Sequence, residues 1–93
     1  LAQFSVDKCF IGADAISAEK GVSTINLFRA EVARAMVKSA RKMIVLATSD
    51  KVGANAVASS FPLTAVHTFI TDSDLSQEGR DLMERSGVEV LTV

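Results

Sequence analysis

Two predicted strands of this 93-residue chain end in polar loops that each carry a carboxylate and a lysine. Asp14 follows the first strand and precedes Lys20 and Gly21, whereas Asp50 and Lys51 follow the second strand. In an open parallel sheet, the carboxyl ends of neighbouring strands form one crevice, and ligands bind there. If the two strands are neighbours, we expect these side chains to meet at a single polar site.

Each candidate also has an ordinary structural explanation. Asp14 can cap a turn in its own loop, and Lys20 stands before a glycine, as many solvated turn lysines do. Glu31 lies in the helix between the two strands and can pair with Arg34 three residues later. Asp50–Lys51 is by default a turn pair. Their shared location, rather than any one residue, therefore indicates a binding site.

Other kinds of chemistry find little support in the sequence. It contains no glycine-rich nucleotide motif and no Cys/His cluster at metal-ligand spacing, so we expect neither a cofactor nor a metal. Cys9 lies mid-strand among apolar residues and is expected to be an inert core residue. His67 alternates with apolar residues in a strand, which argues against a catalytic base.

Composition predicts one small α/β domain that is part of a larger unit. Apolar residues make up 48% of the chain and the only aromatic residues are five Phe, which suits aliphatic strands buried on both faces. The longest apolar run, residues 43–47, is far shorter than the roughly 18 residues of a membrane span. The single cysteine fits a reducing cytoplasm. We therefore expect a cytoplasmic protein without a membrane partner.

The charge balance argues against tight nucleic-acid binding by this segment alone. The chain contains ten Lys and Arg and eleven Asp and Glu, so its formal net charge is −1. Nucleic-acid-binding modules usually show a basic excess instead. The one basic concentration comes at the end of a predicted helix, where cations complement the helix dipole. Its members are Arg34, Lys38, Arg41 and Lys42.

Apolar periodicity predicts strands at residues 6–13, 43–48, 65–71 and 88–93 and helices at residues 24–41 and 76–86. Residues 14–23 are predicted to form a loop, and residues 49–60 have no clear type. Ser23 or Thr24 is the expected cap of the first helix, and Ser76 and Gly87 are the expected caps of the second. The expected buried stripe of the first helix comprises Leu27, Phe28, Val32, Ala35, Met36 and Ala40. Strands that alternate with helices predict a Rossmann-like parallel sheet with right-handed crossovers.

Several segments resemble the sensor domain of DeoR-type bacterial transcriptional regulators. The resemblance rests first on residues 7–21, which read DKCFIGADAISAEKG, and continues through residues 31–36, the loop 49–51, residues 70–72 and residues 87–90. It implies a three-layer α/β fold similar to sugar-phosphate isomerases and CoA transferases (a NagB/RpiA/CoA-transferase-like fold). It also implies that residues 1–93 are the C-terminal portion of an effector-sensing domain, and that a winged helix-turn-helix precedes them in the regulator.

The same resemblance assigns roles to the candidate residues. Asp14, Lys20 with Gly21, and Glu31 match ligand-site positions, and Lys51 with Asp50 lies in the next strand-end loop. The carboxylates would recognise hydroxyls and the lysines would contact charge or phosphate. The implied ligand is a phosphorylated sugar or related effector, and DNA would be bound only through the domain outside this chain. The implied protein is a homo-oligomeric repressor and not an enzyme.

Two departures and two alternatives accompany this hypothesis. Thr48 stands where family members often have Asp, and Ala15 where they often have Gly, so the accepted ligand can differ. The first alternative is a fragment of a sugar-phosphate isomerase-like enzyme that uses Glu31 as a base. The second is a structural dimerisation domain with a vestigial pocket.

Overall fold

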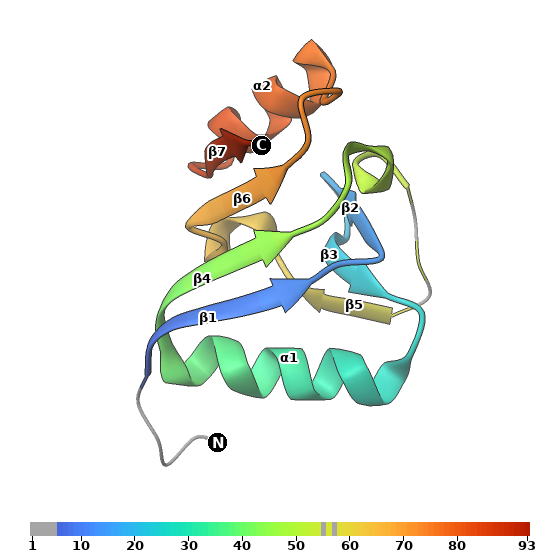
Figure 1. The fold of residues 1–93 in the computed structure, drawn as a ribbon. Helices are drawn as coiled ribbons and strands as arrows, with labels where there is room; N and C mark the ends of the chain where they lie inside the picture. Colours follow the sequence, from blue (N-terminus) through green and yellow to red (C-terminus); the bar gives the residue numbers. More distant parts are fainter. Residues whose placement is uncertain (1–5, 55, 57) are drawn as a thin grey trace.

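A four-stranded parallel sheet forms the centre of the computed structural model, which describes residues 6–54, 56 and 58–93 (Figure 1). The strand order is β1–β4–β6–β7, and every neighbouring pair is parallel. The α/β class and the parallel sheet predicted from the sequence are therefore confirmed. The bounds are β1 Val6–Gly12, β4 Ala40–Leu46, β6 Thr68–Thr71 and β7 Glu89–Thr92.

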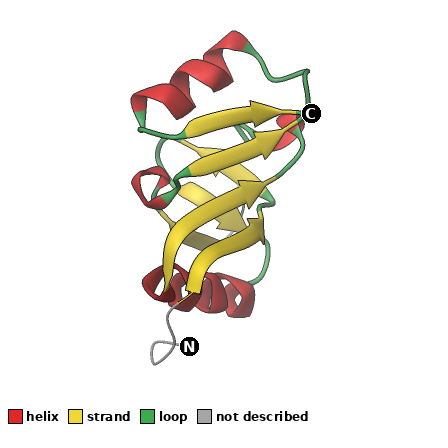
Figure 2. Ribbon diagram, turned by 60° about the vertical axis from the view of Figure 1, so that its left-hand side comes forward, coloured by secondary structure: helices red, strands yellow, loops and turns green. Residues whose placement is uncertain are grey.

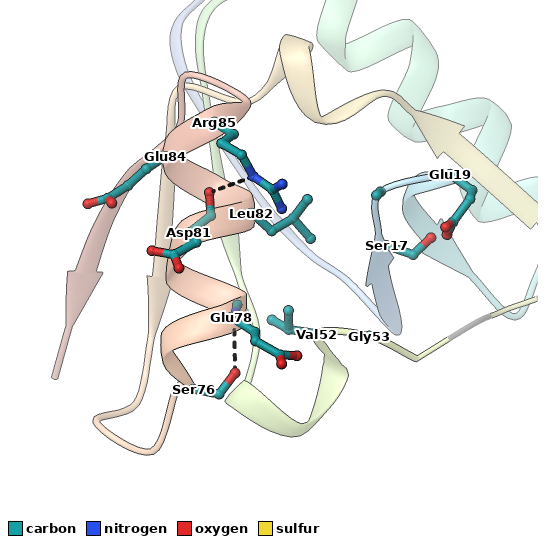
Figure 3. Close-up of a pocket in the computed structure, with 12 residues that line it drawn as sticks. Ser17, Glu19, Val52, Gly53, Ser76, Glu78, Asp81, Leu82, Glu84 and Arg85 are labelled. Atoms are coloured by element: carbon teal, nitrogen blue, oxygen red, sulfur yellow. Dashed lines mark hydrogen bonds between the residues drawn. The ribbon is translucent and has the colours of Figure 1, made fainter.

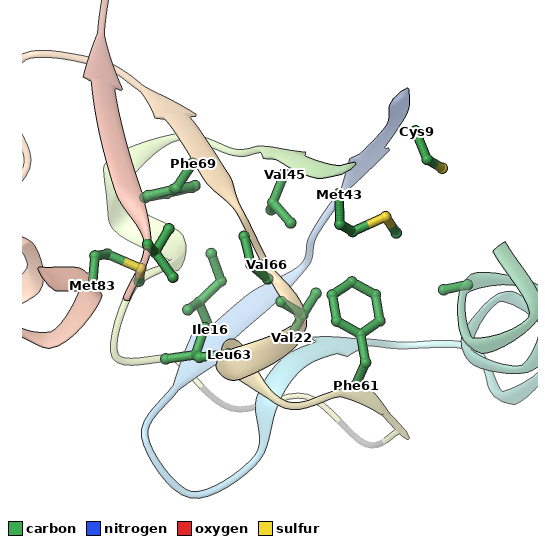
Figure 4. Close-up of a cluster of buried hydrophobic side chains, with 12 residues drawn as sticks. Cys9, Ile16, Val22, Met43, Val45, Phe61, Leu63, Val66, Phe69 and Met83 are labelled. Carbon is green, nitrogen blue, oxygen red and sulfur yellow. The ribbon is translucent and has the colours of Figure 1, made fainter. Parts of the chain in front are cut away.

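The connections between these strands cover one face of the sheet. Along the chain, each new strand of this sheet lies on the same side of the strand before it. Right-handed crossovers between strands in this order all lie on one face of the sheet. The helices α1 (Leu27–Ser39) and α2 (Gln77–Arg85) belong to these connections. Ala33 of α1 and Met83 of α2 accordingly join one core cluster with Met43 and Phe69 of the sheet (Figure 4). Figure 2 shows both helices and the sheet after a 60° turn about the vertical axis.

Cys9 belongs to this core, as the sequence predicts. Its side chain is buried in β1 and lies in the same cluster as Met43, its partner in the ladder between β1 and β4. Burial raises the pKa of the Cys9 thiol. Because the thiolate is the reactive form, this position favours an inert cysteine.

The predicted loop at residues 14–23 is wrong, because most of it forms a buried β-hairpin. The strands β2 (Ala15–Ser17) and β3 (Gly21–Thr24) are antiparallel, and β5 (Ala58–Phe61) extends them to a second sheet in the order β2–β3–β5. Ile16 and Val22 from the hairpin lie in the main core. The strands are only three and four residues long and are rich in Ser and Gly, so they carry no recognisable strand pattern of their own. Burial against the parallel sheet and pairing with distant β5 stabilise them instead.

The first helix is shorter than predicted and buries different residues. Asn26 caps α1, since its Oδ1 accepts hydrogen bonds from the amides of Phe28 (2.8 Å) and Arg29 (3.2 Å). The predicted caps, Ser23 and Thr24, lie in β3 instead. The helix ends at Ser39, and β4 begins at the next residue.

The predicted buried stripe of α1 is also wrong in its first half. Leu27, Phe28 and Val32 are exposed, whereas Ala30 and Ala33 are fully covered. Small alanine side chains let the helix lie close to β5 and β3, which it contacts. The larger side chains of its first two turns consequently point away from the core.

The second helix matches its sequence signals. The hydroxyl oxygen of Ser76 accepts a hydrogen bond from the amide of Gly79 at 3.0 Å, so the predicted N-cap is confirmed. Gly87 follows the helix with φ of 81°, the left-handed conformation expected of a terminating glycine. Short 3-10 helices at Ser49–Lys51 (η1) and Leu63–Ala65 (η2) complete the elements. No helix in the described part of the chain is both long and apolar enough to cross a membrane.

Candidate functional site

Asp14 lies after the carboxyl end of β1 and forms hydrogen bonds with residues just before α1. Its Oδ2 accepts hydrogen bonds from the Thr24 hydroxyl (2.8 Å) and the Ile25 amide (3.1 Å), and its own amide donates to the Ser23 carbonyl (3.1 Å). These two bonds to the carboxylate lower the pKa of Asp14, and the positive charges of Arg29 and Lys51 lower it further. Asp14 is therefore ionised at neutral pH, and the charges of two cations favour that form.

Lys51 pairs with one carboxylate at this edge of the sheet and its charge reaches a second. Its Nζ is 3.7 Å from Oδ2 of Asp50, and its charge acts on both Asp14 and Asp50. The hydroxyl of Thr48 donates a hydrogen bond to Oδ1 of Asp50 and is the main cause of the lowered pKa of Asp50. The structure thus brings Asp14, Asp50 and Lys51 to one edge, where the loops after β1 and β4 meet.

Asp72 extends the group along the same edge, directly after β6. Its Oδ2 accepts a hydrogen bond from the Ser49 amide and its Oδ1 accepts one from the Asp74 amide, both at 2.9 Å. The bond from Ser49 is the main cause of the lowered pKa of Asp72, whose charge in turn raises the pKa of Asp50. We call the group of Asp14, Arg29, Asp50, Lys51 and Asp72 the edge cluster.

Two members of the edge cluster were not among the candidates from sequence. Arg29 was missed because the predicted helix start was too early, which hid its place in the first turn of α1. Asp72 follows a predicted parallel strand directly, which is the same signal that identified Asp14. Asp72 thus follows from the rule that polar residues at strand ends share one edge, whereas Arg29 reaches that edge from the start of α1.

Lys20 and Gly21 lie at the opposite end of the hairpin from Asp14. Lys20 is exposed in the turn, its amide donates to the Ser17 hydroxyl (3.1 Å), and its Nζ donates to the Ala56 carbonyl (3.3 Å). The hairpin pairs Ala15 with Ser23 and Ser17 with Gly21, so the turn lies about 10 Å along the strands from the edge cluster. The structure does not bring Lys20 and Asp14 together.

Glu31 is exposed on the second turn of α1. No hydrogen bond or ion pair joins it to the edge cluster among the residues that the structure describes. Its assigned role as a ligand or a base remains a prediction from the resemblance.

A cavity of about 740 Å³ lies between α2 and the tip of the hairpin (Figure 3). Its walls carry four carboxylates and one guanidinium, and Val52 and Leu82 supply apolar surface. Arg85 already donates a hydrogen bond to the Asp81 carbonyl at 3.4 Å. This acidic lining disfavours a phosphorylated ligand. The acidic residues are Glu19, Glu78, Asp81 and Glu84.

A smaller cavity of about 260 Å³ runs between α1 and β1, and we call it the α1 groove. Phe28, Val32 and Met36 line one side, and Ile11 and Gly12 of β1 line the other. Arg29 belongs both to this groove and to the edge cluster. The groove therefore opens toward the carboxyl ends of the strands with a cation at that end.

Comparison with known proteins gives consistent matches. The profile of the DeoR C-terminal sensor domain matches residues 1–73. The chain is 34% identical over 91 residues to the HTH-type transcriptional repressor GlcR of Bacillus subtilis (98% of this chain, 35% of the relative). It is 32% identical over 85 residues to the HTH-type transcriptional regulator GlpR of Haloferax volcanii (91% and 33%). It is also 30% identical over 93 residues to a putative aga operon transcriptional repressor of Escherichia coli O157:H7 (100% and 35%). The chain thus spans about a third of the length of these curated relatives.

Proposed function

This chain belongs to the family of DeoR C-terminal sensor domains, and we propose that it forms the effector-binding part of a DeoR-type transcriptional repressor. In this proposal a phosphorylated sugar or related metabolite binds at the edge cluster. Binding shifts the regulator between operator-bound and released states, because the two states differ in their affinity for the effector. Such a regulator works in the cytoplasm as an oligomer, since paired DNA-binding modules read symmetric operators.

One observation supports the location of the site. Arg29 and Lys51 both act on Asp14 at the carboxyl end of the parallel strands, so two cations and an ionised carboxylate lie within electrostatic reach of one another. Cations form strong charge-assisted hydrogen bonds with phosphate, and carboxylate oxygens accept them from sugar hydroxyls. The cavity beside α2 is more acidic, with four carboxylates and one guanidinium against three carboxylates and two cations in the edge cluster. An anionic effector therefore fits the edge cluster better.

We assign the phosphate contact to Lys51 and Arg29. Lys51 retains exposed surface and its Nζ has a loose 3.7 Å pairing, so it can turn to a ligand at little cost. Asp50, whose side chain is 72% exposed, and the second carboxylate oxygen of Asp14 would accept hydrogen bonds from hydroxyls. Lys20 and Glu31 would contribute only if the ligand or the hairpin extends to them.

The relatives argue against the isomerase alternative. Those matched over almost the whole chain are transcriptional regulators. Glu31 is exposed on α1 without a described contact to the edge cluster, so the structure adds no support for a base at that position.

Operator release tests the proposed function. We expect one member of a panel of pentose and hexose phosphates to release the full-length protein from its own promoter DNA in a gel-shift assay. The unphosphorylated sugar should have no effect at the same concentration. Release by none of the panel, or equal release by the unphosphorylated sugar, would contradict the proposal.

A further inference from the structure

The short 3-10 helix η1, which carries Asp50 and Lys51, is capped by a residue from a different part of the chain. Thr48 precedes η1 in the N-cap position, but its side chain makes no cap hydrogen bond and its hydroxyl donates to Asp50 instead. The Ser49 amide, the first of η1, donates to Oδ2 of Asp72 at 2.9 Å. A carboxylate 23 residues further along the chain therefore takes the place of the local cap.

The same carboxylate joins the loops after two neighbouring strands. The hydrogen bonds between β4 and β6 run as far as the one from the Ala47 amide to the Ile70 carbonyl (3.2 Å). Two residues later along each strand, the bond from Ser49 to Asp72 continues this connection. The other oxygen of Asp72, Oδ1, accepts from the Asp74 amide at 2.9 Å and fixes the side chain in its own turn. Asp72 therefore couples the position of η1 to the end of β6.

The other end of η1 is fixed to the hairpin. The Gly53 amide donates to the Ile16 carbonyl at 2.7 Å, and Val52 forms an isolated parallel bridge with Ile16. The backbone between these contacts and Asp72 is thus held at both ends, whereas the side chain of Lys51 is 41% exposed. This arrangement leaves the ammonium group accessible on a fixed backbone.

The charge of Asp72 by itself opposes an anionic ligand. Hydrogen bonds from Ser49 lower the pKa of Asp72, and the resulting negative charge raises the pKa of Asp50, so it is felt across the edge cluster. A negative charge at this distance weakens the attraction of a phosphate for the same site. The hydrogen bonds of Asp72 and its charge therefore have opposite expected effects on effector binding, and an experiment can separate them by sign.

We propose that Asp72 is a positioning residue, which holds η1 so that the ammonium group of Lys51 meets the phosphate of the effector. The inference rests on the proposed function, in which Lys51 makes that contact. Asp72 acts through the Ser49 amide and not by touching the ligand. A backbone that is already fixed loses less conformational freedom when the ligand binds, which favours binding.

A double-mutant cycle in the full-length regulator tests this proposal. The ligand is the member of the pentose and hexose phosphate panel that releases operator DNA, and its affinity is measured by calorimetric titration. Asp72→Ala should weaken binding by about threefold to tenfold, and it should have no further effect in the Lys51→Gln background. Asp74→Ala is the matched control, because it removes the same charge from the same turn. The Asp74 side chain is exposed and makes no hydrogen bond within the described residues, so this variant should bind equally well or slightly more tightly.

Hydrogen exchange of the Ser49 amide shows whether the cap itself is responsible. This amide should be protected in the wild type and exchange faster in Asp72→Ala. Asp72→Asn is the second variant, because it keeps the shape of the side chain and one acceptor oxygen. Its affinity should fall only as far as the Ser49 amide loses protection. Weak binding with a protected Ser49 amide, in either variant, would overturn the proposal.

The cycle also separates this proposal from the proposed function. Equal losses from Asp72→Ala in both backgrounds would mean a general structural effect, and tighter binding would mean that only the charge matters. Either result would overturn the positioning role. A loss in Lys51→Gln with none in Asp72→Ala overturns the positioning role alone, whereas no loss in Lys51→Gln overturns the phosphate contact as well.

Discussion

Replacing Gly21 by alanine should separate β3 of the hairpin from β5. It should lower the free energy of unfolding of the domain by about 3–5 kcal/mol. Gly21 has φ of 70°, in the left-handed region, where a side chain is strained. A Cβ at this position would lie 2.3 Å from the Phe61 carbonyl oxygen and 2.7 Å from the Pro62 Cα. Both obstacles are backbone atoms, so neither can turn away. The measurement is urea unfolding of the full-length protein, with exchange of the β3 and β5 amides to locate the loss.

Gly53→Ala is the control for this prediction. Gly53 also has a positive φ, of 92°, but a Cβ there would meet nothing within 4 Å. This substitution should cost only about 1 kcal/mol, the conformational part alone. Equal costs at the two positions would mean that the close approach of β3 to Phe61 and Pro62 does not constrain the fold. In the resemblance Gly21 is a ligand-site residue, whereas its contacts in the structure are those of a packing position.

Replacing Asp14 by alanine should cost about 2–3 kcal/mol and remove most effector binding. The substitution leaves the Thr24 hydroxyl and the Ile25 amide without the carboxylate that accepts their hydrogen bonds. It also loosens the junction between β3 and the cap of α1, which positions Arg29. Asp7→Ala is the matched control, because the Asp7 side chain is 89% exposed and pairs with Arg41 only at 4.0 Å.

The pH dependence of the Asp14→Ala effect follows from the lowered pKa of Asp14. A carboxyl group with a lowered folded-state pKa stabilises the fold fully above its unfolded pKa, about 3.9, and this stabilisation is lost as the pH falls through the folded value. The difference in stability between wild type and variant should therefore be constant near neutrality and shrink below about pH 4. A difference that grew on acidification would contradict the role given to the ionised carboxylate.

The features that sequence predicts best are those whose signals are local. Ser76 and Gly87 mark the ends of α2, and aliphatic runs mark the strands of the parallel sheet. The strand-end rule also predicts that Asp14, Asp50 and Lys51 share one edge, where the fold places them. These predictions need only the spacing of apolar residues along the chain and the identity of the residues that follow each strand or helix.

The features that were missed depend on distant parts of the chain. The hairpin at residues 15–24 becomes strand-like only when β5, more than thirty residues later, pairs with β3. The buried face of α1 could not be chosen from side-chain size, because the helix packs through Ala30 and Ala33 and leaves Leu27 and Phe28 outside. Lys20 follows Asp14 closely in sequence, yet the hairpin carries it to the far end of two strands. Short spacing along the chain therefore did not mean proximity in the fold.

Calorimetric titration of the full-length regulator with the phosphorylated sugar that releases operator DNA tests the central claim most directly. Lys51→Gln should weaken binding by about tenfold or more, because one charge-assisted contact to phosphate is lost. Glu78→Gln, in the acidic cavity beside α2, should leave the affinity unchanged or slightly improve it. Unchanged affinity in Lys51→Gln together with a marked loss in Glu78→Gln would place the effector in the acidic cavity and contradict the assignment of the edge cluster.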